Sequence, residues 1–261
     1  MHSDVVELRD FYNGHLGHLA QRTIRRQIRD LWPSVQGESI LGVGYATPYL
    51  GPFRGEAERL FAAMPASQGV TAWPRNAPGL TTLAEESHLP FADYSIDKVL
   101  LVHGLEMTDQ LPNLMSEVWR VLRGGGRLLC VVPNRRGIWA RIDATPFGHG
   151  QPYSAGQLSR TLRHHSFVPE QTGKALFVPP LRSRMLLRSA GAWEQMGHRF
   201  FEGFAGVVLM EASKQLYRVA PSGRRQKARL PRLVPLPSPA ASNASASTTT
   251  SSLPRDLKAD D

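Results

Sequence analysis

The sequence predicts an α/β domain with a doubly wound, mostly parallel sheet and helices on both of its faces. Apolar runs of strand length alternate along the chain with segments whose apolar residues recur at helical spacing. One run, residues 96–102, is apolar almost throughout, which is typical of a parallel strand buried between two helical layers. Because crossovers between parallel strands are right-handed, this alternation places helices on both faces.

The first half of the chain supplies the opening elements of this sheet. Apolar residues from Leu16 to Leu31 recur at helical spacing, and Pro33 ends that helix. The run 39–43 predicts a buried strand, and the spacing of apolar residues over 57–64, before Pro65, predicts a helix. Weaker strands are predicted at 69–73 and 80–84, each bounded by Gly or Pro.

The second half continues the alternation. After the strand 96–102, one apolar stripe predicts a helix over 111–122, closed by the glycines 124–126. A strand follows at 127–132, then a helix over 153–165 that starts near Ser154, and a strand at 167–177. Residues 203–217 predict a final strand or strand pair.

Composition divides the chain into three parts. Residues 1–36 form a predicted helical segment packed on the main domain, residues 37–220 form that domain, and residues 221–261 form a basic, Ser/Ala/Thr-rich tail that cannot bury a core. The chain carries a net charge of +9, of which the eight basic and three acidic residues from Arg218 onward supply +5. Such a tail is ordinarily solvated, and contact with nucleic acid or an anionic surface is the alternative.

Cysteine usage and hydropathy favour a cytoplasmic location. Cys130 is the single cysteine and cannot form an internal disulfide, and no Cys/His pattern predicts a metal site. No apolar run approaches the roughly 20 residues that a transmembrane helix needs, and residues 1–9 lack the apolar stretch of a signal peptide.

The first candidate site is the turn that follows the strand 39–43. In an open parallel sheet, ligands bind beyond the carboxyl ends of the strands. The turn contains Gly42, Gly44, Tyr45 and Ala46 before Thr47, so that its small residues let the backbone pass close to a bound nucleoside.

Three further stretches support a specific family. They are residues 85–99 (EESHLPFADYSIDKV), Leu105-Glu106, and residues 117–129 (EVWRVLRGGGRLL). In order and spacing the chain resembles the class I S-adenosylmethionine-dependent methyltransferase family of the type 11 kind. The likeness is clear over residues 38–134 and looser to about residue 217. It implies a Rossmann-like fold, S-adenosylmethionine as cofactor, and transfer of its methyl group to an acceptor.

The resemblance also assigns candidate residues. It places the turn 42–47 at the methionine part of S-adenosylmethionine, and Glu85, with Glu86 beside it, at the adenine amino group. The sequence departs from the family pattern at three points: Gly42 replaces an acid, Ala46 and Pro48 replace glycines, and Trp73 stands near the position expected for the ribose-binding acid. The predicted cofactor-binding residues are Gly42, Gly44, Tyr45, Ala46, Trp73, Glu85, Glu86 and His103.

His103 is the best-placed catalytic candidate, because an imidazole at a strand end suits proton transfer at neutral pH. His149 and Tyr153 are secondary candidates, in a region where this fold commonly places acceptor-facing loops. Five arginines in the second half of the chain could attract an anionic acceptor, although surface arginines are ordinarily solvated. These basic residues are Arg135, Arg136, Arg182, Arg184 and Arg188.

Three functional hypotheses remain open. The leading one is a methyltransferase whose acceptor is a small molecule. The first alternative is a non-catalytic protein of this fold that binds a partner or ligand, because the expected acids are missing. The second is a nucleic-acid-binding or nucleic-acid-modifying protein that uses the tail. A dinucleotide oxidoreductase is disfavoured, since no Gly-x-Gly-x-x-Gly pattern opens the first helix.

Overall fold

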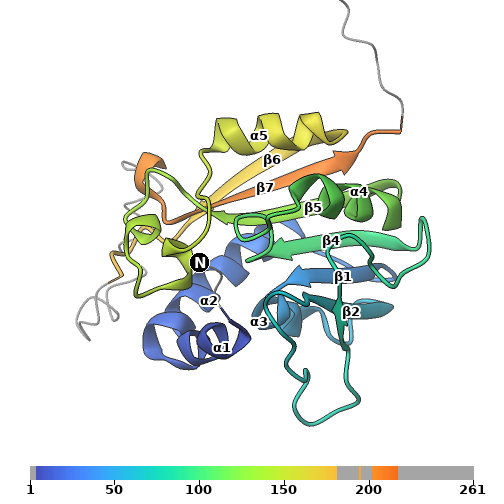
Figure 1. Cartoon of the computed structure of the whole chain (residues 1–261), viewed down its shortest axis with the longest axis horizontal. Coiled ribbons are helices and arrows are strands. Elements are labelled where there is room, and N and C mark those ends of the chain that lie inside the picture. The colour runs from blue at the N-terminus through green and yellow to red at the C-terminus, as the bar shows by residue number, and fades with distance from the viewer. Residues whose placement is uncertain (1–3, 181–193, 195–201, 217–261) are drawn as a thin grey trace, which may run out of the picture. The chain divides into compact units, whose positions relative to one another are not determined.

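The computed structural model describes residues 4–180, 194 and 202–216. Within them the strands form one sheet in the order β3-β2-β1-β4-β5-β7-β6 (Figure 1). Strands β1 to β5 are parallel to one another, and β7 is antiparallel to both β5 and β6. The predicted mostly parallel, doubly wound sheet is therefore confirmed. The strands are β1 (Ser39–Gly44), β2 (Arg59–Pro65), β3 (Thr81–Ala84), β4 (Ile96–Val102), β5 (Leu122–Pro133), β6 (Phe167–Ala175) and β7 (Val207–Lys214).

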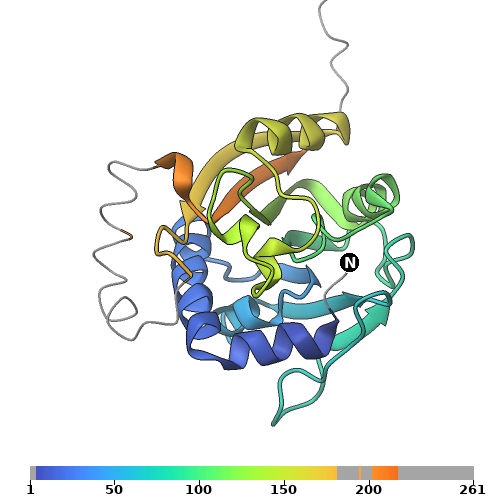
Figure 2. The same cartoon turned by 60° about the vertical axis from the view of Figure 1, so that its left-hand side comes forward.

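Helices cover both faces of the sheet (Figures 1 and 2). One core contains buried residues of α1, α2 and α3 together with Ile40 and Leu100, and the other contains those of α4 and α5 together with Leu41 and Leu101. Adjacent strand residues thus face opposite cores, as the pleat requires. The helices are α1 (Val5–Asn13), α2 (His15–Leu31), α3 (Thr47–Leu50), α4 (Leu111–Val121) and α5 (Ala155–His164).

Several local signals act where the sequence predicts them. Helix α2 ends at Trp32, just before Pro33, and β4 spans the predicted run 96–102. Helix α5 begins after Ser154, whose hydroxyl accepts a hydrogen bond from the Gln157 backbone while the Gln157 side chain accepts one from the Ser154 backbone. This reciprocal cap supplies acceptors to amides that would otherwise lack partners at the helix start.

Two predicted elements are wrong. Residues 57–64 do not form a helix, because Arg59–Pro65 is strand β2, which pairs with β1 on one side and β3 on the other. Its apolar residues fill both faces of the sheet, and a short apolar run does not distinguish that arrangement from a buried helix. Residues 69–73 form no strand but belong to the loop between β2 and β3, in which the Leu80 amide bonds the Trp73 carbonyl at 2.8 Å.

The turn after β1 lies at the point where the strand order reverses. Gly44 has a φ of +79°, and a Cβ there would lie 2.2 Å from the Val102 carbonyl oxygen of the neighbouring strand. A Cβ on Gly42 would lie 2.7 Å from the Ala46 side chain. Both glycines therefore allow the turn to pack tightly against the protein itself.

The remaining expectations concern regions outside this core. The predicted tail, residues 221–261, lies outside the described residues, as do Arg182, Arg184 and Arg188. No helix among the described residues is sufficiently long and apolar to cross a membrane.

Candidate cofactor-binding and active site

A buried cluster of polar side chains occupies the carboxyl ends of β1 and β4. His103 follows β4 with a φ of +50° and is fully buried. Its Nε2 lies 2.7 Å from the Tyr12 hydroxyl, and its Nδ1 lies 3.1 Å from Oε1 of Glu106. The Tyr12 hydroxyl also lies 2.7 Å from that of Tyr49. Helix α1, the turn after β1 and the end of β4 are thus joined by one chain of hydrogen bonds.

One assignment of protons satisfies this chain. In this assignment the Nδ1–H of His103 donates to Oε1 of Glu106, and Nε2 accepts from the Tyr12 hydroxyl. The Tyr12 oxygen then accepts from the Tyr49 hydroxyl. Burial raises the pKa of Tyr12 well above its ordinary value, and the nearby Tyr49 adds to the increase, so Tyr12 remains a neutral donor. This assignment gives His103 the tautomer in which Nε2 is the acceptor.

Two buried oxygens at this cluster find no hydrogen-bond partner among the described residues. They are Oε2 of Glu106 and Oε1 of Gln68. The Gln68 amide nitrogen donates to the His103 carbonyl and lies 3.6 Å from the sulfur of Met107. Because an unpartnered buried acceptor costs free energy, the pair of oxygens indicates a place for a group that donates hydrogen bonds.

A groove, here called the donor groove, opens beyond β2, β3 and β4. It encloses about 310 Å³ and is lined by Ala66, Ser67, Glu85, Glu86, Asp109 and Gln110. Glu85 directly follows β3 and is exposed, whereas Glu86 is half-buried and accepts a hydrogen bond from the Thr108 hydroxyl. The structure therefore brings the two predicted adenine-binding carboxylates to the edge where a ligand of this fold binds.

The other predicted cofactor residues lie apart from this groove. Tyr45 and Ala46 are buried, and the Tyr45 ring stacks on Tyr12 with centroids 5.6 Å apart. Trp73 does not stand at the end of the second strand, which is Pro65, so Ala66 and Ser67 occupy the position beyond that strand instead. The missing acid expected there is consequently replaced by small residues and not by an aromatic one.

The loop after β5 reaches the buried cluster through a residue that was not predicted. The Phe147 ring packs against His103 with centroids 5.0 Å apart. His149 instead directs its Nε2 to the Asp143 carbonyl at 2.9 Å, and Tyr153 lines a separate cavity together with Arg135. Burial raises the pKa of the Tyr153 hydroxyl.

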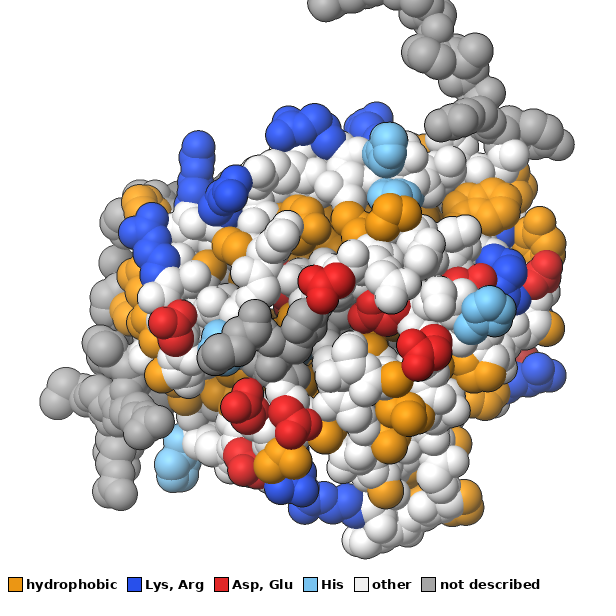
Figure 3. Space-filling view, viewed as in Figure 1, with side chains coloured by type: hydrophobic (Ala, Val, Ile, Leu, Met, Phe, Trp, Pro, Cys, Tyr) orange, Lys and Arg blue, Asp and Glu red, His pale blue; other side chains and the backbone are white. Residues whose placement is uncertain are grey.

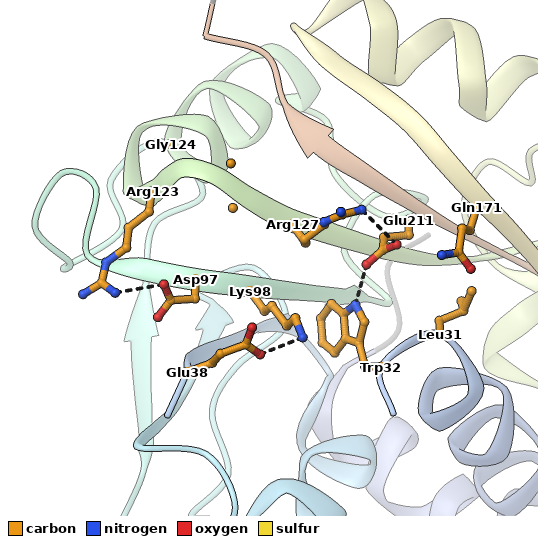
Figure 4. Close-up of a pocket in the computed structure, with 12 residues that line it drawn as sticks. Leu31, Trp32, Glu38, Asp97, Lys98, Arg123, Gly124, Arg127, Gln171 and Glu211 are labelled. Carbon is orange, nitrogen blue, oxygen red and sulfur yellow. Dashed lines mark hydrogen bonds and ion pairs between the residues drawn. The ribbon is translucent and has the colours of Figure 1, made fainter. Parts of the chain in front are cut away.

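A further cavity lies near the amino ends of β1 and β4 and encloses about 390 Å³ (Figure 4). Its charged side chains already have partners: Lys98 lies 2.6 Å from Glu38, and Arg127 lies 3.3 Å from Glu211. Glu211 also accepts from the Trp32 indole at 2.9 Å. These contacts tie α2 to the sheet and indicate a structural role.

Sequence reasoning missed most members of the buried cluster. Tyr12 lies on α1, inside the predicted helical segment 1–36 but before the helix predicted from Leu16, and Tyr49 and Gln68 belong to a very short helix and a loop. The available signal was the helical spacing of Leu8, Phe11 and Tyr12, which marks an apolar face on residues 5–13.

Comparisons with known proteins agree with this fold. Residues 41–130 match the family described as methyltransferase domain. A demethylmenaquinone methyltransferase from Beutenbergia cavernae is 27% identical over 231 residues, which cover 83% of this chain and 90% of that protein. One from Listeria welshimeri is 28% identical over 86 residues, covering 32% and 36% respectively.

Solved structures show the same architecture. A methyltransferase from Thermotoga maritima that depends on S-adenosylmethionine superposes with a TM-score of 0.56 at 16% sequence identity, covering 81% of this chain and 96% of that one. The sheet order, the match over residues 41–130 and this likeness of fold agree with one another. Residues 41–130 therefore resemble a methyltransferase domain, and the chain has the fold of the S-adenosylmethionine-dependent methyltransferase from Thermotoga maritima.

Proposed function

We propose that the chain is a methyltransferase that binds S-adenosylmethionine between the donor groove and the buried cluster and methylates a small-molecule acceptor. One observation carries the proposal: Glu85 and Glu86 line a groove beyond β3, and Glu106 keeps an unpartnered oxygen beside His103. The cofactor combines a purine amine with a cationic methionine end. Carboxylates at both places suit these groups, because they accept strongly from amines and ammonium groups.

Each set of residues has a distinct part in the proposed reaction. S-adenosylmethionine supplies a methyl group on a sulfonium, so the protein mainly aligns donor and acceptor. Glu85 and Glu86 hold the adenine end, and Glu106 and Gln68 receive the ammonium end. His103 is fully buried, so access to it requires α1 to move and carry Tyr12 away. That movement exposes Nε2 of His103, which takes a proton from an acceptor hydroxyl where the reaction requires one.

The proposal specifies the methyl acceptor only as a small molecule. The relative that aligns along most of its length is named demethylmenaquinone methyltransferase, so demethylmenaquinone is the first acceptor to test. On the face shown in Figure 3, the described basic side chains lie mostly toward the edges and form no broad patch. A nucleic-acid acceptor would favour such a patch.

A cytoplasmic location remains part of the prediction from the single cysteine.

Calorimetric titration of the full chain with S-adenosylmethionine and S-adenosylhomocysteine tests the donor site. We expect Glu85→Gln to weaken binding about tenfold, because a charge-assisted hydrogen bond contributes roughly 1.5–3 kcal/mol. Glu58→Gln is the matched control, since Glu58 is exposed and lies outside the groove. Absence of heat from protein shown to be folded by circular dichroism would contradict the proposal, as would an equal loss in both variants.

A further inference from the structure

A second, basic pocket lies between α1, α2, the turn after β1 and the loop that joins β2 to β3. This arginine pocket encloses about 300 Å³, and its lining includes Arg9, Arg25, Arg75, Tyr12, Tyr45 and Trp73. It shares no lining residue with the donor groove. Helices α1, α2 and α3 lie close together in both views of the fold (Figures 1 and 2). The pocket is therefore built from segments that are distant in sequence.

The charge of the arginine pocket is strongly one-sided. Of the residues that the structure describes, no carboxylate lines it, and the acid nearest in sequence, Asp10, is exposed and pairs with Arg9 at 3.3 Å. Arg25 is half-buried, and its Nε donates to the Pro48 carbonyl at 2.6 Å. Among the described residues neither Arg25 nor Arg75 forms an ion pair. An unpaired guanidinium that is partly desolvated favours the binding of an anion.

The pocket also offers aromatic surface beside its charges. Tyr45 stacks on Tyr12, and the half-buried Trp73 has the Arg54 guanidinium 6.0 Å from its ring centre. Burial raises the pKa of Tyr45 to about 12, and the charges of Arg9 and Arg75 oppose that increase. Both guanidiniums therefore act on the phenol, which places positive charge next to the aromatic wall.

We propose that the arginine pocket binds a small planar molecule that carries a carboxylate or phosphate group. The anionic group is held by the fork-shaped guanidiniums of Arg25 and Arg75, which match the geometry of both oxyanions. The planar part lies against the half-buried Trp73, whose ring face favours stacking. A volume of about 300 Å³ accommodates one ring with its acidic group. This site is separate from the donor groove and does not depend on methyl transfer.

The test uses the full chain and two probes, phenyl phosphate and 4-hydroxybenzoate, with phenol as the neutral control. Calorimetry and tryptophan fluorescence measure binding, and the two probes distinguish a phosphate ligand from a carboxylate ligand. We expect one of them to bind and phenol not to bind. Arg75→Gln should weaken that binding about tenfold to a hundredfold, because one charge-assisted contact is lost. Arg75 is exposed, so its substitution removes a surface charge and leaves the core unchanged.

The matched control is Arg26→Gln, which removes an exposed charge from the same helix as Arg25 but outside the pocket. We expect its affinity for the probe to equal that of the unaltered chain. Three outcomes would overturn the proposal: no binding of either anion at about 10 mM, equal weakening in both arginine variants, or binding of phenol as tight as that of the anions. Loss of S-adenosylmethionine binding in Arg75→Gln would assign the pocket to the donor and would also overturn it.

Discussion

The hydroxyl of Tyr12 is the point at which the hydrogen-bonded chain at the carboxyl ends of the strands is most easily tested. Tyr12→Phe removes one oxygen and keeps the ring that stacks on Tyr45. It deletes two hydrogen bonds of 2.7 Å, to His103 and to Tyr49. It also leaves Nε2 of a fully buried imidazole without its partner. Since neutral hydrogen bonds contribute about 1 kcal/mol each, we expect the free energy of unfolding to fall by about 2 kcal/mol.

Urea denaturation followed by circular dichroism measures this loss. The midpoint should fall while the slope stays unchanged, and the melting temperature should fall by roughly 4–8 °C for a domain of this size. Tyr94→Phe is the matched control, because Tyr94 is 52% exposed and its hydroxyl forms no hydrogen bond within the described part of the chain. A loss below about 0.5 kcal/mol in Tyr12→Phe would refute the reasoning, because that is the scale of an ordinary surface substitution. It would show that the buried hydroxyl contributes nothing to holding α1.

Three other predictions follow from single contacts. Gly44→Ala should lower the free energy of unfolding far more than Gly125→Ala. Both residues have positive φ, but of the two only Gly44 has neighbouring backbone where a Cβ would lie. Thermal melts measure the difference, and equal losses in the two variants would contradict this reasoning. A hydrogen bond from Arg120 holds the pKa of Glu117 below its ordinary value. This pair therefore stabilises the fold at pH values above the unfolded-state pKa of about 4.3. The stabilisation is lost as the pH falls through the lower pKa of the folded state. Urea titrations should therefore show a shallower acid loss in Glu117→Gln, and an unaltered pH profile would count against the pair. Burial raises the pKa of the Cys130 thiol, so a thiol reagent should react with it only after unfolding, and rapid reaction with native protein would contradict its burial.

The sequence by itself determined much of the sheet and the likeness of its first half to a methyltransferase domain. Where one signal dominates, local pattern sufficed: the run 96–102 became β4, the apolar stripe over 111–122 became α4, and Ser154 begins α5. Spacing also placed Glu85 at the end of a strand, because the order of motifs fixes the order of strand ends. The family likeness over residues 38–134 corresponds to the matched methyltransferase domain at 41–130.

Only the tertiary structure decided what surrounds those strand ends. The segment 59–65 has the spacing of a helix but lies between β1 and β3, where pairing on both sides outweighs local preference. Tyr12, Gln68 and His103 are far apart in sequence, and no local periodicity indicates that they share one buried network. The arginine pocket arises in the same way, from helices and loops that meet only when the sheet is assembled. Local pattern reports which face of an element is apolar, whereas packing decides which polar groups meet.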